Sequence, residues 1–390
     1  MTIEQTPNIT YTETDQNPKM IGSGAVIPLV IGQTGNTVEP DDITIKKYKS
    51  LTQIGATVAN GGIGNADSNM SYHFFKKFLK ETKKIYSDDV GLPYVYFIDM
   101  GSIAFTNGEA WAKAFNLAMT QRDIGKIAIV GFKKANATTA ISASEIANIV
   151  GILSAGNQII VEDSKKGSPK RLMFTVADAT DEDMMKITDD ASASFIQKSR
   201  VLPCAPDFYP EMVARFCLTP YDEEPGFYDF RSVSPDDVVV RTEDMEEDLQ
   251  NAGINFIRKE MEGSIEHARI CLGVSSAMAA NIRPNDVLPH FRRNVDHLIN
   301  RIVVAAYPYL KRNESKSSIE MFQTDIDTIV EEEIEKGAMQ EGTEITAVES
   351  DINPFQIFIK GNAKPVNATL YIGVEMYISE PNILAVPTNN

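Results

Sequence analysis

Histidines come first among the residues that could do chemistry, since imidazole nitrogens bind metal ions and transfer protons near neutral pH. His290 and His297 are seven residues apart in a segment with helical periodicity, and Asp286 precedes them. Two imidazoles and a carboxylate on one helix face could hold a divalent ion. No HxxxH or HExxH spacing accompanies them, so the sequence favours histidines that pack against neighbours or lie at the surface.

The glycines of 62–64 could form a phosphate-binding loop, because Gly62-Ile63-Gly64 precedes a helix. A dinucleotide-binding loop follows a strand directly and needs a third small residue, where this chain has Asp67. Residues 57–60 make a poor strand, so the pattern predicts a turn. The P-loop pattern GxxxxGK[ST] does not occur in the sequence.

Other groups that could be catalytic also lack a supporting pattern. Ser275 and Ser276 are not part of a GxSxG elbow. The acidic runs at 236–237, 246–248 and 331–333 are typical of solvated surfaces, and nothing selects a pair for acid–base work. We therefore expect a protein that is not an enzyme and that uses no metal or other cofactor. A nucleotide-binding enzyme stays open as an alternative.

The net charge of the chain limits the kinds of molecule that it can bind. Acidic residues outnumber basic ones by 54 to 37 in 390 residues, which gives a net charge of −17. Such a chain lacks the basic surface that binds phosphate backbones, and an anionic membrane would repel it. The widely spaced Cys204, Cys217 and Cys271 predict free thiols. The N-terminus lacks a secretory signal, and the longest apolar runs are too short to span a bilayer. These features favour folding in the cytoplasm.

Hydrophobic periodicity places the elements around these residues. It predicts a strand at 24–31, an amphipathic helix at 69–86 and an alternation of strands and helices from 92 to 205. Six prolines between 203 and 235 indicate a connector. Thr242 then caps a helix that ends near Gly253. Short strands near 254–259 and 268–274, helices at 290–310 and 318–337, and strands at 344–348, 354–360 and 368–378 complete the chain.

The last third carries an ordered set of motifs. A short helix ends in Gly253-Ile254-Asn255 and leads into a strand, residues 269–276 hold an arginine and a glycine, and 291–299 begin a long helix with two arginines. The next helix ends in Gly337-Ala338, an asparagine turn lies at 351–354, and the last strand exits through Ser379-Glu380-Pro381. In order and spacing these motifs resemble the contractile tail sheath family, although the threonine expected after Gly273 is missing.

The resemblance implies a mixed α+β and α/β fold in several parts. Residues 21–90 and 245–378 would form a discontinuous inner domain, built from an N-terminal strand and C-terminal helices and strands. Residues 91–244 would be an inserted outer α/β domain. Residues 1–20 and 379–390 would be extended arms, which exchange strands with neighbouring subunits through Ile9, Thr10, Tyr11, Thr12, Glu13, Ile378, Ser379, Glu380 and Pro381.

The resemblance also implies a function and partners. A sheath subunit polymerises as stacked hexameric rings around an inner tube, meets a baseplate and a tail terminator, and contracts to drive the tube through an envelope. It contacts neither nucleic acid nor membrane, and assembly takes place in the host cytoplasm. We expect exposed Glu331, Glu332, Glu333 and Glu335 on helix 318–337 to face the tube. Another self-assembling shell or capsid protein is the second alternative.

Overall fold

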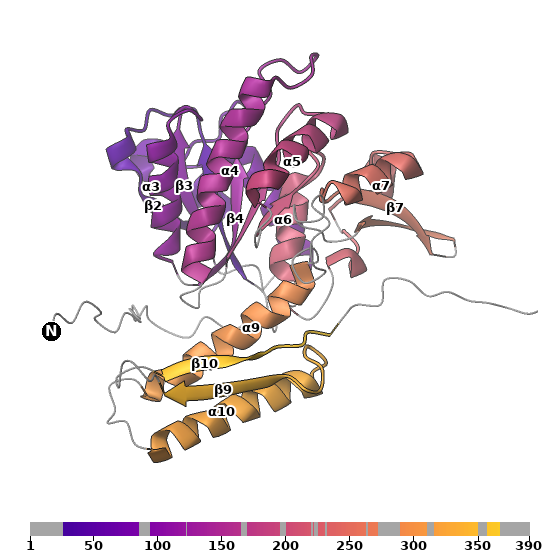
Figure 1. Ribbon diagram of the computed structural model, residues 1–390. Helices are drawn as coiled ribbons and strands as arrows, with labels where there is room; N and C mark the ends of the chain where they lie inside the picture. The colour runs from indigo at the N-terminus through magenta and orange to yellow at the C-terminus, as the bar shows by residue number, and fades with distance from the viewer. Residues whose placement is uncertain are drawn as a thin grey trace, which may run out of the picture.

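The computed structural model describes residues 26–85, 94–121, 123–164, 170–195, 200–219, 221, 225–230, 232–262, 264–271, 289–309, 316–349 and 357–366. Within these residues, a large body is built on a six-stranded sheet, and a smaller helix-and-ribbon unit lies beside it (Figure 1). The mixed α/β class expected from the sequence is confirmed at this level.

The sheet has the strand order β2-β3-β1-β4-β5-β6. Five strands run parallel, and only the edge strand β2 is antiparallel to its neighbour. Without β2, the order is that of a common type of doubly wound sheet. The strands are β1 (Ile27–Gln33), β2 (Ile45–Tyr48), β3 (Val95–Gly101), β4 (Ile124–Val130), β5 (Arg171–Phe174) and β6 (Val201–Pro203).

Two cores sandwich this sheet because alternate residues of each strand point to opposite faces. Leu29 and Ile31 of β1 face one core, and Val30 faces the other. Helices α3 (Gly108–Met119), α4 (Ala143–Ser164) and α5 (Asp181–Phe195) cover the first face. Helices α2 (Met70–Ile85) and α6 (Tyr209–Leu218) cover the second. Short turns of helix complete the body, namely α1 (Leu51–Ile54), η1 (Pro40–Asp42), η2 (Val58–Asn60), η3 (Pro225–Phe227) and η4 (Pro235–Asp237).

The position of β1 bears on the expected domain boundary at residue 90. β1 pairs with β3 on one side and with β4 on the other, so residues 27–33 and 95–130 belong to one sheet. That boundary therefore passes through a sheet. The reason is topological, because a parallel sheet is completed by strands that are far apart in the chain.

The connector expected from the prolines between 203 and 235 contains a helix that the sequence analysis missed. α6 begins at Tyr209, with Pro210 in its first turn. Proline is tolerated there because the amide it lacks would have no partner within the helix. All of α6 except Pro210 is buried, so packing against α2 stabilises a segment whose prolines suggest irregular structure.

The Gly-Ile-Asn motif attaches a side element to the sheet. Helix α7 (Glu243–Asn251), capped by the Thr242 side chain, ends before Gly253 at a φ of 73°. Ile254 then enters the first core, and Asn255 donates from Nδ2 to the Pro203 carbonyl at 2.7 Å. The chain continues into an antiparallel ribbon of β7 (Ile257–Glu262) and β8 (Ile265–Ile270).

The C-terminal unit consists of α9 (Pro289–Ala306), α10 (Lys316–Glu335) and the antiparallel ribbon of β9 (Glu344–Glu349) and β10 (Ile357–Asn362), with the 3-10 turn η6 (Tyr307–Tyr309) after α9. It has its own core around Leu298, Phe322 and Ile326. Gly337 ends α10 in the left-handed region, as the sequence predicts. Figure 1 shows α9 leading from the sheet body to this unit, with the ribbon and α10 beyond it. The expected strand at 368–378 lies outside the described residues.

Candidate functional site: the charged faces of helix α9

The glutamates expected to face a tube do not share one environment. Glu331 and Glu335 are exposed on α10, and Glu332 is partly covered. Glu333 is 0% exposed, so the expectation of an exposed Glu333 is wrong. The apolar periodicity of α10 identifies its inner stripe. It does not show that a neighbouring helix also covers a polar position beside that stripe.

Glu333 lies at the centre of a cluster that joins three segments. Its Oε1 accepts from Nη1 of Arg301 on α9 at 2.6 Å, and its Oε2 accepts from the Tyr221 hydroxyl at 2.9 Å. His297, also on α9, lies with Nε2 3.6 Å from Oε1 and stacks on the Tyr221 ring at a centroid distance of 3.6 Å. Arg301 binds Glu332 as well. The cluster therefore holds α9 and α10 to the segment that follows α6.

Electrostatics keep the buried Glu333 carboxylate ionised. Burial alone would raise its pKa, but the hydrogen bond from Arg301, the charge of His297 and the hydrogen bond from Tyr221 together lower the pKa of Glu333 below its ordinary value. The stacking of His297 agrees with the packed histidine expected from the sequence. The side chain of His290, and all of Asp286, lie outside the described residues. Within the described part of the chain, no group of three His, Cys, Asp or Glu residues could hold a metal ion.

A second side of α9 faces the sheet. Asp296 receives two hydrogen bonds from Arg200, at 2.7 and 3.0 Å, and lies 3.7 Å from Nη2 of Arg171. Arg293 donates to the Thr219 carbonyl at the end of α6. Lys126 of β4 is buried nearby; its burial and the charges of Arg171 and Arg293 hold its pKa well below the usual range. Asp296 therefore brings negative charge to a buried group of basic side chains at the amino ends of β4, β5 and β6.

Neither side of α9 has a sequence motif that would have revealed it. Arg200, Arg171 and Tyr221 come from separate segments of the body. Only the arginines of 291–299 signalled a charged helix. The two clusters join the C-terminal unit to the sheet body in different ways. Asp296 of α9 forms an ion pair with Arg200, and Glu333 of α10 accepts a hydrogen bond from the Tyr221 hydroxyl.

The crevice where a doubly wound sheet binds nucleotides lies at the carboxyl ends of β1 and β4. Gln33, the last residue of β1, and Gly131, directly after β4, lie at this position. Gln33 donates to the Ile103 carbonyl at 2.7 Å and lies against Gly131, whose added Cβ would be 3.0 Å from the Gln33 Cβ. Thr34 donates to Asp99 at 2.7 Å. Gln33 and Thr34 thus form hydrogen bonds that stabilise the segments at the carboxyl ends of the strands.

Glycines 62–64 form a packed turn. The Gly62 amide donates to the Thr57 carbonyl, and the Gly64 amide donates to the Ala56 carbonyl. A Cβ on Gly62 would lie 2.2 Å from the Ala56 oxygen, so the glycine is required by close backbone approach. The turn predicted from the sequence is confirmed.

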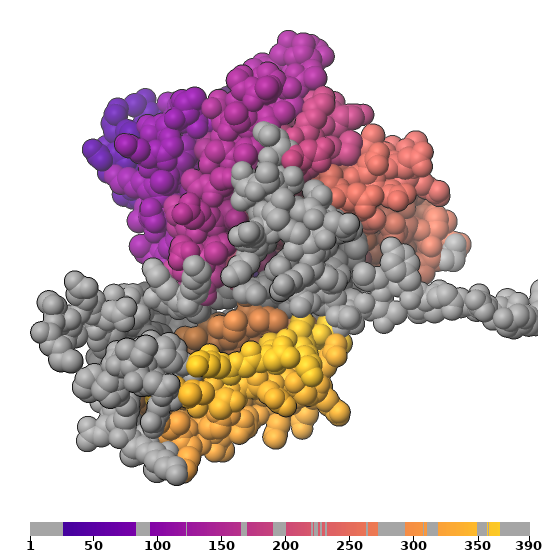
Figure 2. Space-filling model, in the orientation of Figure 1, coloured from indigo at the N-terminus to yellow at the C-terminus, as the bar shows by residue number. Residues whose placement is uncertain are grey.

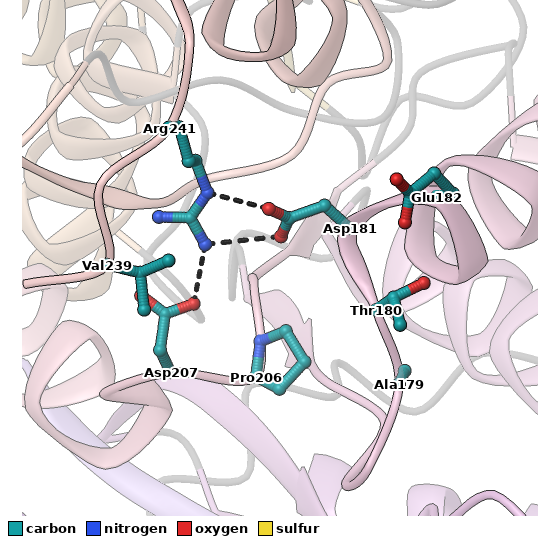
Figure 3. A pocket seen from close by; sticks show the side chains of 8 residues that line it. All are labelled: Ala179, Thr180, Asp181, Glu182, Pro206, Asp207, Val239 and Arg241. Atoms are coloured by element: carbon teal, nitrogen blue, oxygen red, sulfur yellow. Dashed lines mark hydrogen bonds and ion pairs between the residues drawn. The ribbon is translucent and has the colours of Figure 1, made fainter. Parts of the chain in front are cut away.

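An open cavity of about 370 Å³ lies near the ends of β5 and β6 (Figure 3). Arg241 donates across it to Asp181 at 2.8 and 3.1 Å and to Asp207 at 2.7 Å. Burial opposes ionisation of Arg241, but these two carboxylates raise its pKa above the ordinary value. The Arg241 guanidinium thus links the segment before α7 to the start of α5 and to the loop after β6.

Other expectations meet the structure as follows. The described cysteines carry free thiols; Cys204 and Cys217 are buried and Cys271 is partly buried. Of the described helices, only α4 is long and apolar enough by composition to cross a membrane. Its Ile149, Leu153 and Ile160 pack in the first core, which accounts for that composition. The arm residues 9–13 and 378–381 lie outside the described residues.

Comparison with known proteins gives a result only at the level of structure. No protein-family model matches the sequence, and no curated protein matches it significantly. Three solved chains share the fold over almost their whole length. One is from the anti-feeding prophage baseplate (TM-score 0.65, 15% identity, covering 96% of this chain and 99% of that one). The second is from the contracted helical sheath of the same prophage, with a TM-score of 0.65, 14% identity and coverage of 96% of this chain and 100% of that one.

The third is the contracted PVC sheath complex of an extracellular contractile injection system, with a TM-score of 0.63, 10% identity and coverage of 97% and 99%. Because 96–97% of this chain is covered, the matched part includes both the sheet body and the C-terminal unit. The expected resemblance to sheath proteins is confirmed for the fold: this chain has the fold of contractile sheath proteins.

Proposed function

We propose that the chain is the structural subunit of a contractile sheath, which polymerises as stacked hexameric rings around an inner tube and contracts to drive that tube through an envelope. The observation that carries this proposal is the shared fold over 96–97% of this chain and 99–100% of three chains from contractile systems. A structural role without catalysis fits those neighbours. The baseplate, the tail terminator and the tube are the proposed partners, with assembly in the host cytoplasm.

The terminal arms are proposed to link the subunits. β7–β8 and β9–β10 are two-stranded ribbons whose outer edges pair with no described strand, and at the β8 edge the Ala268 carbonyl accepts from the Phe230 amide at 2.8 Å. Open edges accept further strands through backbone hydrogen bonds. Ile9–Glu13 and Ile378–Pro381 of neighbouring subunits would supply such strands. Backbone hydrogen bonds of this kind would survive large movements of each subunit.

We assign the inner position to the C-terminal unit and the outer position to the sheet body, with residues 91–244 facing outward. The support is the exposed acidic end of α10, where Glu331 and Glu335 are free to meet basic groups of a tube. In this arrangement the two buried clusters on α9 transmit force between tube side and outer side. The extended sheath would be metastable, and a few kcal/mol per subunit, summed over many subunits, would drive cooperative contraction without nucleotide.

Negative-stain electron microscopy of the purified protein tests the proposal. The full-length chain should form hollow, helically striated cylinders. A variant lacking residues 1–18, and a second in which a Gly/Ser segment of equal length replaces them, should remain folded but unpolymerised. Cylinders from all three would remove the N-terminal arm from the mechanism. Monomers from the full-length chain, even with its tube protein added, would contradict the sheath function.

Contact with the tube has its own test. Glu331→Lys with Glu335→Lys should abolish tube-dependent assembly and leave the fold unchanged, since both side chains are exposed. Asp42→Lys with Glu109→Lys makes the same change of charge on the sheet body and serves as the matched control. Equal assembly of the two variants on tubes would place the tube contact elsewhere.

A further inference from the structure

Helix α2 carries a basic face in a chain of net charge −17. Lys76, Lys77 and Lys80 are all exposed, and none forms an ion pair with a described residue. Phe74, Phe75 and Phe78 on the opposite side of the helix pack into the second core. The lysines are therefore exposed together on one side of α2, hereafter the lysine face, where the charges of Lys77 and Lys80 also act on buried Glu211 of α6.

Helix α7 carries the complementary group. Asp244, Glu247 and Asp248 are exposed, follow the i, i+3, i+4 spacing of a single helix side, and form no ion pair with a described residue. Leu249 anchors the helix to the first core. These three carboxylates are the acidic face. Each face extends over four residue steps, or about 6 Å of helix.

The two faces are separated within one molecule. α2 packs on one side of the six-stranded sheet, and α7 packs with the core of the other side. α7 lies at the rim of the molecule in the view of Figures 1 and 2. Since the faces differ and lie apart, a contact between them joins copies head to tail. Such contacts close rings or extend filaments.

We infer that the lysine face of α2 in one copy docks on the acidic face of α7 in the next, as one lateral contact of the polymer. This inference rests on the proposed function for its setting, and on charge complementarity for the pairing. Three exposed pairs are worth about tenfold in the association constant at moderate salt, and screening weakens them as salt rises. The contact therefore directs register and adds to the strand exchange.

Charge exchange tests the pairing. The first variant, Lys76→Glu, Lys77→Glu and Lys80→Glu, makes both faces acidic. The second, Asp244→Lys, Glu247→Lys and Asp248→Lys, makes both faces basic. Each alone should assemble about tenfold to a hundredfold less readily than the natural chain. A one-to-one mixture should recover assembly, because each variant offers the partner that the other lacks. A chain carrying all six changes keeps the net charge of −17 and should assemble alone.

The control variant, Lys49→Glu, Lys133→Glu and Lys186→Glu, makes the same change of charge at three scattered exposed positions and should assemble normally. Circular dichroism checks that every variant is folded. Normal assembly of both triple variants, or failure of both the mixture and the six-fold variant, would overturn the inference while the sheath function stands.

Sedimentation separates the inference from the proposed function. At low salt, the mixture of the two triple variants should associate at about a tenfold lower protein concentration than either variant alone, because the contact is worth about tenfold in the association constant. This difference is expected for rings or short oligomers even if the natural chain makes no cylinders. Equal association of the mixture and of each variant alone, with cylinders from the natural chain, would refute the docking contact alone.

Discussion

Asp296 of α9 accepts two hydrogen bonds from the guanidinium of Arg200, at 2.7 and 3.0 Å, across 96 residues of sequence. The pair is largely buried, with 5% and 12% of the Arg200 and Asp296 side chains exposed. This ion pair with two hydrogen bonds joins the sheet body to the C-terminal unit and fixes the relative orientation of the Arg200 and Asp296 side chains.

Asp296→Asn should therefore lower the free energy of unfolding by about 3 kcal/mol, because it leaves buried Arg200 and Arg171 without their counter-charge. Urea denaturation measures the loss. Asp42→Asn, at an exposed position, is the control and should change stability by less than about 0.5 kcal/mol. Similar losses in the two variants would show that Asp296 contributes no more than a surface charge.

Glu333→Gln should cost about 3 kcal/mol, since Arg301 loses its buried ionic partner and Tyr221 a charged acceptor. Hydrogen exchange should accelerate in α9 and α10 before it changes in the sheet. Glu331→Gln, two positions earlier and exposed, is the matched control and should leave exchange unchanged. The role assigned to the cluster fails if both variants exchange alike.

Acid should weaken the buried pair of Lys134 and Asp183, whose Nζ–Oδ2 distance is 2.7 Å. Burial opposes ionisation of Asp183, but hydrogen bonds from the Ile141 amide, Lys134 and the Thr180 amide lower its pKa to about 2. Because the pKa of Asp183 is lower in the folded state than in the unfolded state, its ionised carboxylate stabilises the fold at pH values above the unfolded pKa of 3.8. This stabilisation is lost as the pH falls towards 2. The contribution is roughly 2 kcal/mol.

Asp183→Asn should remove that part of the pH dependence. The stability difference from the natural chain, followed by urea denaturation from pH 6 to pH 2, should be largest above about pH 4 and shrink below it. A difference independent of pH over that range would mean that the carboxylate charge is not the source of the stabilisation.

Two glycines of α4 should respond oppositely to alanine. A Cβ on Gly156 would lie 2.5 Å from Cζ of Phe115, so Gly156→Ala should push α3 from α4 and cost about 1–3 kcal/mol. Gly151 has nothing within 4 Å of an added Cβ, so Gly151→Ala should stabilise by about 0.5–1 kcal/mol. Thermal unfolding ranks the variants. The reverse order would contradict the packing of these helices.

Much of the local structure could be predicted because short-range rules govern it. The apolar stripe of α2 and the Thr242 cap of α7 were visible in sequence, as were the glycines that end α7 and α10. α6 was missed because Pro210 and the prolines on either side of the helix obscure a helical pattern that tertiary packing stabilises. The bounds of α4 were not visible in sequence, because Gly151 and Gly156 weaken the helical signal in a helix that continues to Ser164.

The charged faces of α9 could not be predicted from periodicity. Glu333 and Glu331 have similar neighbours in sequence, yet one is enclosed by Arg301 and Tyr221 and the other is exposed. Arg200 and Asp296 meet only because β6 and α9 come together in the folded chain. Single-sequence patterns identify which side of an element is apolar, but pairing of distant polar groups depends on the tertiary arrangement.

The separation of 96 positions between Arg200 and Asp296 also has a consequence during synthesis. At about 5–20 residues per second, a ribosome adds Asp296 roughly 5–20 s after Arg200. Once β6 has been added, all six strands of the sheet are made, but Arg171 and Arg200 at the amino ends of β5 and β6 have no α9 to cover them. Until α9 is made, water must solvate these arginines. When α9 docks, Asp296 replaces that water, so the last third of the chain completes the sheet body as well as its own unit.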